Sequence, residues 1–389
     1  MNTAIVGWGH TPFGRLDGRS LEALVVQVAR EAVEHAELEF SDIDAICLGH
    51  FNAGMVPESF CSSLALQADP ALRFVPATRL ENACASGAAA VFHARALIES
   101  GQARHVLVIG AEKMTAVDGA AVTGALASAS YGPEEARAGL TFPGIFARIA
   151  RDYFARHGDR SAALARVAVK NHANGARNPL AHLQRALDFD FCNTVSERNP
   201  MIAAPLRKTD CSLVSDGAAA LVMTDARTAL ARPRAVRLRA AVHVNDFLPL
   251  SRREAIRFEG PALAFSLAYD QARIGVGDLD FAEVHDCFTI AELLSYEAMG
   301  LCAPGDGARA IDDGLVLPGG RLPVNLSGGL KAKGHPIGAT GVSMHVMAAM
   351  QLTGTAGACQ HHGAELGAVF NMGGSAVASY VTLLETLKA

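Results

Sequence analysis

Short apolar runs rich in β-branched residues alternate with longer helical patterns along this chain, and the alternation occurs twice. The first series predicts strands and helices at Thr3–Val6, Leu21–His35, Ile43–Leu48, Cys84–Glu99 and His105–Ile109. The second series predicts them at Ala235–Val244, Pro261–Ile274, Asp280–Val284, Thr289–Met299, Arg321–Leu326, after Gly338, and within Gly367–Leu383. Strands that alternate with helices are typical of parallel α/β layers. We therefore expect an α/β protein made of two similar halves.

A segment between the two series differs from both. Residues 115–205 contain two helical patterns, Phe146–Arg156 and Ser161–Asn174, without a recognisable strand register. Inserted segments of this length commonly carry binding function above a rigid scaffold. The predicted organisation is an N-terminal half of residues 1–114 and 206–232, an inserted loop domain of residues 115–205, and a C-terminal half of residues 233–389.

Composition narrows the class of partner. With 389 residues, of which 50% are hydrophobic, the chain can bury large cores, and disorder is excluded as its main state. A net charge of -5 gives no electrostatic reason to expect nucleic acid or an anionic membrane. Gly, His, Pro, Asn and Ser interrupt the two long uncharged stretches, 334–364 and 366–384, which favours buried elements over membrane spans. A small-molecule partner is expected.

The eight cysteines lack the close paired spacing of a zinc site or a redox dithiol. They are expected to be free thiols in a reducing compartment. The first residues read as a strand and lack the basic and apolar regions of a signal peptide. We therefore predict a cytoplasmic protein.

Several common site motifs are missing or incomplete. The run from Gly7 to Pro12 begins like a dinucleotide fingerprint, but Pro12 stands where a third glycine must open a helix. P-loop, HExxH zinc-protease and nucleophile-elbow motifs do not occur. Cysteine and histidine remain as the candidates for chemistry.

Cys84 lies in the run Asn82-Ala83-Cys84-Ala85-Ser86-Gly87, at the predicted start of an apolar helix. Unpaired N–H groups at a helix start stabilise a thiolate, so we expect the pKa of Cys84 below about 8.5. Cys84 is therefore a candidate nucleophile. A small buried core residue is an equally good interpretation of this cysteine taken alone.

Two further segments place histidines where chemistry is possible. His335 lies on a turn shaped by Gly334 and Pro336 just before a buried helix, which could aim an imidazole for acid–base work. His285 and Cys287 follow a predicted strand, at the edge where α/β sheets place their ligands. Each segment alone is more often structural than catalytic.

Taken together, these three segments resemble the thiolase superfamily, in its sterol-carrier-protein-like branch. The motifs on which the resemblance rests are Asn-Ala-Cys-Ala-Ser-Gly at 82–87, His-Asp-Cys-Phe at 285–288 and Gly-His-Pro-Ile-Gly-Ala-Thr-Gly at 334–341. The resemblance also covers Tyr153 to Pro179, Pro205 to Val222 and Asn325 to Gly341, so it spans nearly the whole chain. It implies a five-layered αβαβα fold, with a central five-stranded sheet in each half and a loop domain inserted in the first.

The resemblance implies a role for each matching residue. Cys84 would carry an acyl group as a thioester. His335 would accept the thiol proton and, with His285, hold the oxygen of an enolate. The backbone N–H groups of Cys84 and Gly373, with Gly374 as the next candidate, would hold the oxyanion of the adduct on Cys84.

The turn Asn371-Met372-Gly373-Gly374 departs from ordinary thiolases, whose Cys-x-Gly box supplies a second catalytic cysteine. Asn371 occupies that position and cannot transfer protons at neutral pH. In this branch the cysteine of the His-Asp-Cys-Phe box is thought to take the role, so Cys287 becomes the acid–base candidate. A cysteine that merely packs beside the site is the alternative.

The implied activity is that of an acyl-CoA C-acyltransferase, which cleaves 3-ketoacyl-CoA with coenzyme A or condenses two acyl-CoAs. Alternatives are a ketoacyl-synthase-like condensing enzyme, a retro-aldolase on acyl-CoA, and a non-catalytic acyl-CoA-binding scaffold subunit. Coenzyme A is the expected co-substrate, without a permanently bound cofactor or metal. Basic residues near the motifs are expected to be solvated surface charges: Arg207, Lys208, Lys331 and Lys333.

Two kinds of protein partner follow from the resemblance. Relatives pair the edge strands of their sheets across a twofold axis, so a homodimer or homotetramer is expected. An OB-fold or zinc-ribbon partner protein, which accompanies some relatives, is a further possibility.

Overall fold

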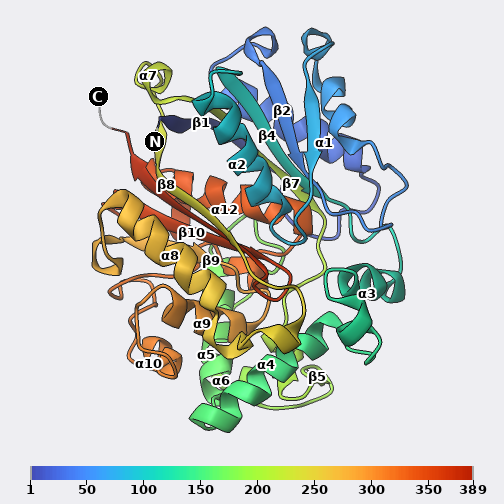
Figure 1. Ribbon diagram of the computed structural model, residues 1–389, viewed down its shortest axis with the longest axis vertical. Coiled ribbons are helices and arrows are strands. Elements are labelled where there is room, and N and C mark those ends of the chain that lie inside the picture. Colours follow the sequence, from blue (N-terminus) through green and yellow to red (C-terminus); the bar gives the residue numbers. More distant parts are fainter. Residues whose placement is uncertain (1, 388–389) are drawn as a thin grey trace.

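A single nine-stranded sheet runs through the computed structural model, which describes residues 2–387 (Figure 1). The strand order is β3-β2-β4-β7-β1-β8-β11-β10-β9. The bounds are β1 Thr3–His10, β2 Ala45–Gly49, β3 Ala77–Leu80, β4 His105–Glu112, β7 Gly217–Asp225, β8 Val236–Asn245, β9 Phe281–Val284, β10 Leu366–Gly373 and β11 Ala378–Thr386. Strands β1 and β8 join the two parts of the sheet through only two residue pairs.

The two parts of the sheet have the same topology. In the first, β2 and β4 are parallel, while the pairs β4 with β7 and β7 with β1 are antiparallel. In the second, β9 and β10 are parallel, while the pairs β10 with β11 and β11 with β8 are antiparallel. The predicted duplication into two similar halves is thus visible in the strand order.

One predicted strand is wrong. The segment Arg321–Leu326 forms only an isolated bridge between Val324 and Ala282, so the second part has four full strands where five were expected. Pro323 has no N–H to donate, and Asn325 has a left-handed φ of 57°. These two residues prevent a regular ladder on either side of Val324.

Helices occupy three layers around the two parts of the sheet. Helix α1 (Leu21–His35) covers the outer face of the first part, and α8 (Glu259–Ala272) covers the outer face of the second (Figure 1). Helices α2 (Ser86–Glu99) and α12 (Ile337–Leu352) pack together between them. This arrangement confirms the five-layered αβαβα fold.

Helix α12 is enclosed on all sides, because every residue in it except Met350 is buried. The second uncharged stretch forms β10 and β11. Among the residues described, no helix combines the length and the apolar character that crossing a membrane requires.

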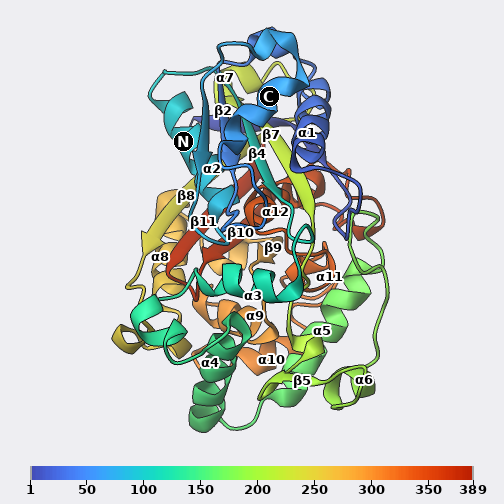
Figure 2. The same ribbon diagram turned by 90° about the vertical axis from the view of Figure 1, so that its right-hand side faces the viewer.

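The remaining elements lie mainly at one end of the two sheet parts, in the lower half of Figures 1 and 2. Helices α3 to α6 belong to the predicted inserted segment, and the hairpin of β5 and β6 spans the predicted boundary at residue 205. The division into domains stays a prediction. The bounds are α3 Gly119–Ala127, α4 Phe142–His157, α5 Ser161–Gly175, α6 Phe189–Asn193, β5 Met201–Ala203, β6 Leu206–Arg207, α7 Ala226–Ala229, α9 Thr289–Ala298, α10 Gly307–Asp312 and α11 Gly329–Ala332.

Glycines let the starts of α2 and α12 approach each other and the sheet with backbone against backbone. A Cβ atom on Gly87 would lie 2.8 Å from the carbonyl oxygen of Gly338, and one on Gly110 would lie 2.5 Å from the same oxygen. A Cβ atom on Gly341 would lie 2.3 Å from the backbone nitrogen of Ala88. Real Cβ contacts are not this short, so any side chain at these positions would force the elements apart.

We expect the substitution Gly110→Ala to lower the free energy of unfolding by about 3 kcal/mol or more, because overpacking against a backbone oxygen cannot be relieved by a rotamer change. Urea denaturation followed by circular dichroism measures this. Gly124→Ala is the matched control, since a Cβ atom there meets nothing within 4 Å. The control variant should be as stable as the wild type or up to about 1 kcal/mol more stable. Equal stability of the two variants would contradict the close-contact argument.

Candidate active site

Cys84 sits on a tight turn between β3 and α2. Ala83 before it has a left-handed φ of 49°, which is uncommon for a residue with a side chain. The Ser86 hydroxyl donates to the Ala83 carbonyl at 2.6 Å and accepts from the backbone N–H of Asn82 at 2.9 Å. The turn is therefore fixed from within, and it places Cys84 just before the start of α2.

The expected low pKa of Cys84 is wrong. Burial raises the pKa of this thiol to about 12, and the nearby carboxylate of Glu112 adds to the rise. Hydrogen bonds from the backbone N–H groups of Gly374 and of Cys84 itself lower the pKa, but by less. Removal of water destabilises the thiolate more than the two backbone N–H groups stabilise it. The resting site therefore holds a neutral thiol.

His335 is held on the turn that enters α12. Gly334 before it has a φ of +115°, and a Cβ atom there would lie 2.8 Å from the hydroxyl oxygen of Ser215. The Nδ1 atom of His335 is 2.7 Å from the hydroxyl oxygen of Thr340, one turn into the helix. Burial, and then the charge of Lys333, lower the pKa of His335 to about 3, so its ring is neutral.

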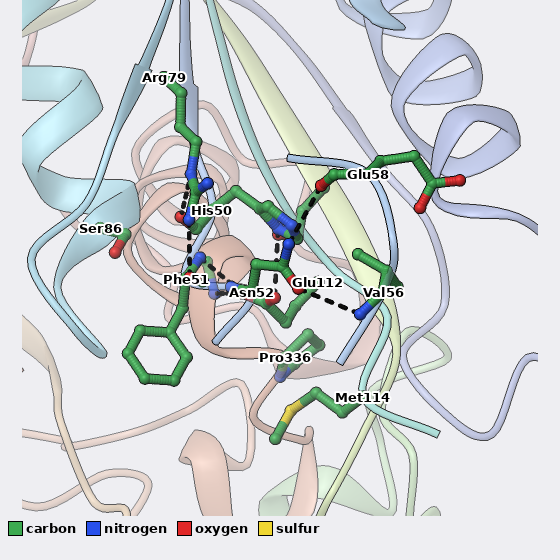
Figure 3. A network of polar contacts seen from close by, with 12 residues as sticks. His50, Phe51, Asn52, Val56, Glu58, Arg79, Ser86, Glu112, Met114 and Pro336 are labelled. Atoms are coloured by element: carbon green, nitrogen blue, oxygen red, sulfur yellow. Dashed lines mark hydrogen bonds and ion pairs between the residues drawn. The ribbon is translucent and has the colours of Figure 1, made fainter. Parts of the chain in front are cut away.

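The carboxylate of Glu112 supports this turn, and Figure 3 shows Glu112 close to Pro336. It accepts hydrogen bonds from the backbone N–H groups of Phe51, Asn52 and Gly338, each at 2.9 Å. Gly338 is the second residue of α12, so the loop after β2 and the start of α12 share one buried acceptor. An acidic residue at the end of a buried strand, as in Ala111-Glu112-Lys113, is the sequence signal that could have identified it.

His285 follows the last residue of β9, and its ring meets the ring of His335, which lies in the same half of the chain. The ring centroids are 5.1 Å apart, and the ring planes are nearly perpendicular at 88°. The Nδ1 atom of His285 lies 2.9 Å from the side-chain nitrogen of Asn371 on β10. Burial, and then His335, lower the pKa of His285 well below its ordinary value, so this ring is also neutral.

The predicted catalytic residues converge. The sulfur of Cys84 and one ring nitrogen each of His285 and His335 lie within 4.8 Å of one another. Cys84, His335 and Cys287 line a cavity of about 640 Å³. Its apolar walls come largely from Met114, Val122, Leu126, Phe142 and Phe288. A buried thiol and two imidazoles thus meet at the wall of a cavity that could hold a small molecule.

The remaining predicted site residues are Cys287, Gly373 and Gly374. Burial raises the pKa of Cys287 well above the ordinary value of a thiol, and the neighbouring Cys84 contributes to the rise. The backbone N–H of Gly374 hydrogen-bonds to the Cys84 thiol and lowers its pKa. This effect on the thiol pKa favours Gly374 over Gly373 as the candidate partner of the Cys84 N–H group.

Asp286 has a supporting role that its motif did not reveal. Its carboxylate accepts from the backbone N–H groups of Leu330 at 2.6 Å and Lys331 at 3.1 Å, so it caps the short helix α11. That helix ends three residues before His335. Burial, and then the neighbouring Glu292, raise the pKa of Asp286 to about 7.

The expectation that the basic residues near the motifs are solvated is wrong for three of the four. Arg207 is buried and pairs with Asp210 at 2.9 Å. Lys331 and Lys333 are 2% and 0% exposed, and the Lys333 ammonium donates to the Ser343 hydroxyl at 2.5 Å. Only Lys208 is exposed. The buried cations are held by the fold and are not free to reach a phosphate.

Comparison with known proteins gives a consistent result. Residues 3–227 match the family model described as thiolase, N-terminal domain, and residues 244–386 match the thiolase C-terminal domain-like model. The chain is 38% identical to the acetyl-CoA acetyltransferase of Methanothermobacter thermautotrophicus, over 96% of this chain and 97% of that protein. It is 30% identical to human sterol carrier protein 2, over 95% of this chain and 69% of that protein. A solved structure titled Ltp2-ChsH2(DUF35) aldolase has the same fold, with a TM-score of 0.84, 24% identity and coverage of 99% and 98%.

The raised pKa of Cys84 makes a spectroscopic prediction. Because burial raises this pKa to about 12, the thiol stays protonated throughout the range from pH 5 to pH 9. The difference in ultraviolet absorbance at the thiolate band between the wild type and Cys84→Ala should therefore show no titration step in this range. A step near pH 6 or 7 would mean that a thiolate–imidazolium pair already exists in the resting enzyme.

Proposed function

Because the chain belongs to the thiolase family, we propose that it is an acyl-CoA C-acyltransferase that works through an acyl group on Cys84. The observation that carries the proposal is the convergence of Cys84, His285 and His335 within 4.8 Å, with Cys84 and His335 lining the cavity. Coenzyme A is the co-substrate. The acetyl-CoA acetyltransferases among its relatives and the similarity to sterol carrier protein 2 support the same assignment.

In the cleavage direction, the Cys84 thiol loses its proton to His335 as the sulfur attacks the keto carbonyl of a 3-ketoacyl-CoA. The oxyanion of the adduct accepts from the N–H groups of Cys84 and Gly374. The bond between C2 and C3 then breaks, its electron pair moves onto the thioester as an enolate, and the acyl group remains on Cys84. His285 and His335 hold the enolate oxygen. Preorganised donors of this kind are among the strongest contributions to catalysis.

Cys287 completes the proton balance. Its thiol gives a proton to C2 of the enolate, which releases the shortened acyl-CoA. The thiol of coenzyme A then gives its proton to the Cys287 thiolate and attacks the acyl group, and the Cys84 sulfur leaves with the proton held by His335. A high pKa suits this role, because the enolate carbon is a strong base and an acid that ionised early would lose its proton to solvent.

A second copy of the chain is the proposed protein partner. Strand β3 ends the sheet, and an exposed strand edge favours pairing with another chain. Phe60 and Phe74, near this edge, are 76% and 85% exposed, and a second copy could cover their apolar surface. We propose a homodimer, or a homotetramer built from it.

The OB-fold or zinc-ribbon partner protein and the cytoplasmic location stay predictions. The eight free cysteines support the cytoplasmic location.

Incubation with an acyl-CoA followed by mass spectrometry tests the function. The wild type should gain the mass of one acyl group on the peptide that contains Cys84, and Cys84→Ala should gain none. A scaffold subunit would show no adduct in either protein. A retro-aldolase would release an aldehyde or ketone from a 3-hydroxyacyl-CoA without free coenzyme A, and that result would replace the proposal.

Cys287→Ala separates the proton-transfer role from packing. Incubated with a 3-ketoacyl-CoA, this variant should still become acylated at Cys84, because cleavage of the C2–C3 bond does not use Cys287. Thiolysis should fall by about 10²-fold or more, because C2 protonation loses its acid and the thiol of coenzyme A loses its base. Thiolysis at the wild-type rate would show that Cys287 only packs beside the site.

A further inference from the structure

Both active-site imidazoles are neutral, so each ring carries one proton, and the position of that proton decides what the ring can do. The pKa of His335 is about 3, and that of His285 is also far below its ordinary value. A neutral imidazole donates from one nitrogen and accepts at the other. The nitrogen that faces the site is a base if it has the lone pair and a hydrogen-bond donor if it has the proton. The group bonded to the opposite nitrogen makes this choice.

Thr340 determines the tautomer of His335. Its hydroxyl oxygen lies 2.9 Å from the carbonyl oxygen of Pro336 and 2.7 Å from Nδ1 of His335. A carbonyl can only accept, so the single hydroxyl proton of Thr340 is committed to Pro336. Toward His335 the hydroxyl can then only accept. Nδ1 of His335 therefore carries the ring proton, and Nε2 has a lone pair for the site.

Asn371 determines the opposite tautomer for His285. Its amide nitrogen lies 3.2 Å from the carbonyl oxygen of Cys84 and 2.9 Å from Nδ1 of His285. The group facing the Cys84 carbonyl must be the NH₂ group, because two acceptors would repel each other. The same NH₂ group has a second proton, which points to Nδ1 of His285. Nδ1 is therefore the acceptor, and Nε2 carries the ring proton.

We infer that Thr340 and Asn371 are positioning residues that hold the two catalytic histidines in opposite tautomers. His335 presents a lone pair that can take the Cys84 proton, and His285 presents an N–H that can donate to the enolate oxygen. The inference rests on the proposed thiolase function for its consequence but on hydrogen-bond logic for its assignment. It gives a role to Asn371, the residue that stands where ordinary thiolases have a second catalytic cysteine.

The surroundings of His285 fit an N–H group that donates only when substrate is bound. The Nε2 atom of this ring is buried and has no hydrogen-bond partner among the described residues. A buried N–H without a partner destabilises the empty site, and a substrate oxygen that accepts from it would remove this penalty. The assignment also separates this cluster from a metal site of the same composition, because only one of the two imidazoles offers a lone pair to the centre.

The duplicated fold contains an internal comparison. His50 follows β2 as His285 follows β9. In the strand registers, Ala111 on β4 has the same position relative to His50 that Asn371 on β10 has relative to His285. The Nδ1 atom of His50 lies 2.9 Å from the carbonyl oxygen of Ala111, so Nδ1 must donate. In the first half a backbone acceptor thus sets one tautomer, and in the second half the Asn371 amide sets the other.

Neutron diffraction from crystals of the deuterium-exchanged full-length protein tests the assignment directly. We expect deuterium on Nδ1 of His335 and on Nε2 of His285. Deuterium on Nε2 of His335, on Nδ1 of His285, or on both nitrogens of either ring would overturn the inference. This result does not depend on activity, so it stays distinct from the acylation test of the proposed function.

Asn371→Asp tests the consequence for His285. The O–H of the new carboxyl group would donate to the Cys84 carbonyl, as the NH₂ group of Asn371 does. Toward Nδ1 of His285 the carboxyl oxygen could then only accept, so the ring proton of His285 should move to Nδ1. Cleavage of 3-ketoacyl-CoA should then fall by about 10²–10³-fold, the usual effect of removing one oxyanion donor. Exchange of labelled coenzyme A into acyl-CoA should be largely retained, because acylation of Cys84 involves no enolate. Equal losses in both reactions, or deuterium still on Nε2 of His285 in this variant, would overturn the role of Asn371.

Thr340→Val is the complementary variant, and Thr340→Ser is its matched control. Valine keeps the shape of threonine but cannot accept from Nδ1 of His335, so the lone pair is no longer fixed toward the site. Because His335 acts in both half-reactions, exchange and cleavage should both fall by at least about tenfold, and serine should restore them. Failure of serine to restore activity, or wild-type rates in Thr340→Val, would show that the hydroxyl does not select the tautomer.

Discussion

The close approach of α2 and α12 is the constraint on which the site depends. Cys84 precedes the first helix and His335 precedes the second, so the distance between sulfur and imidazole is set by how closely the two helix starts can pack. Glycines at 87, 110, 338 and 341 permit contact of backbone with backbone, and none of them leaves room for a Cβ atom. Glu112 then ties the start of α12 to the loop after β2 through three N–H groups. The catalytic distance is therefore fixed by main-chain packing before any functional side chain contributes.

Duplication explains why these parts face each other. Helix α2 follows β3 and leads to β4, and α12 occupies the same place before β10 in the second half. Cys84 and His335, the proposed nucleophile and base, thus come from equivalent turns, and His50 and His285 come from equivalent strand ends. The two halves have diverged in what these positions do. His50 bonds to the carbonyl oxygen of Ala111 in the first half, whereas their counterparts His285 and Asn371 have the proposed role in the chemistry of the second.

The sequence predicted the fold and the principal residues because their signals are local. Alternating strand and helix patterns, small residues at helix starts and three short motifs were enough for the two halves, Cys84, His285 and His335. Three expectations failed because they depend on the surroundings in three dimensions. Burial raises the pKa of Cys84, and distant segments enclose Arg207, Lys331 and Lys333. Pro323 and Asn325 prevent the strand expected at residues 321–326. The tautomers could be assigned only from the positions of the Pro336 and Cys84 carbonyl oxygens, which the motifs do not reveal.

Burial of the whole cluster also explains why the site needs tautomer control. A thiolate–imidazolium pair in water is selected by pKa values alone, and ring protons exchange freely with solvent. Here the thiol and both imidazoles are buried and uncharged, so charge develops only when substrate is present. In that setting a neutral ring with its proton on the wrong nitrogen would present the wrong group to the substrate. Two fixed hydrogen bonds, each anchored on a backbone carbonyl that can only accept, remove that ambiguity in advance.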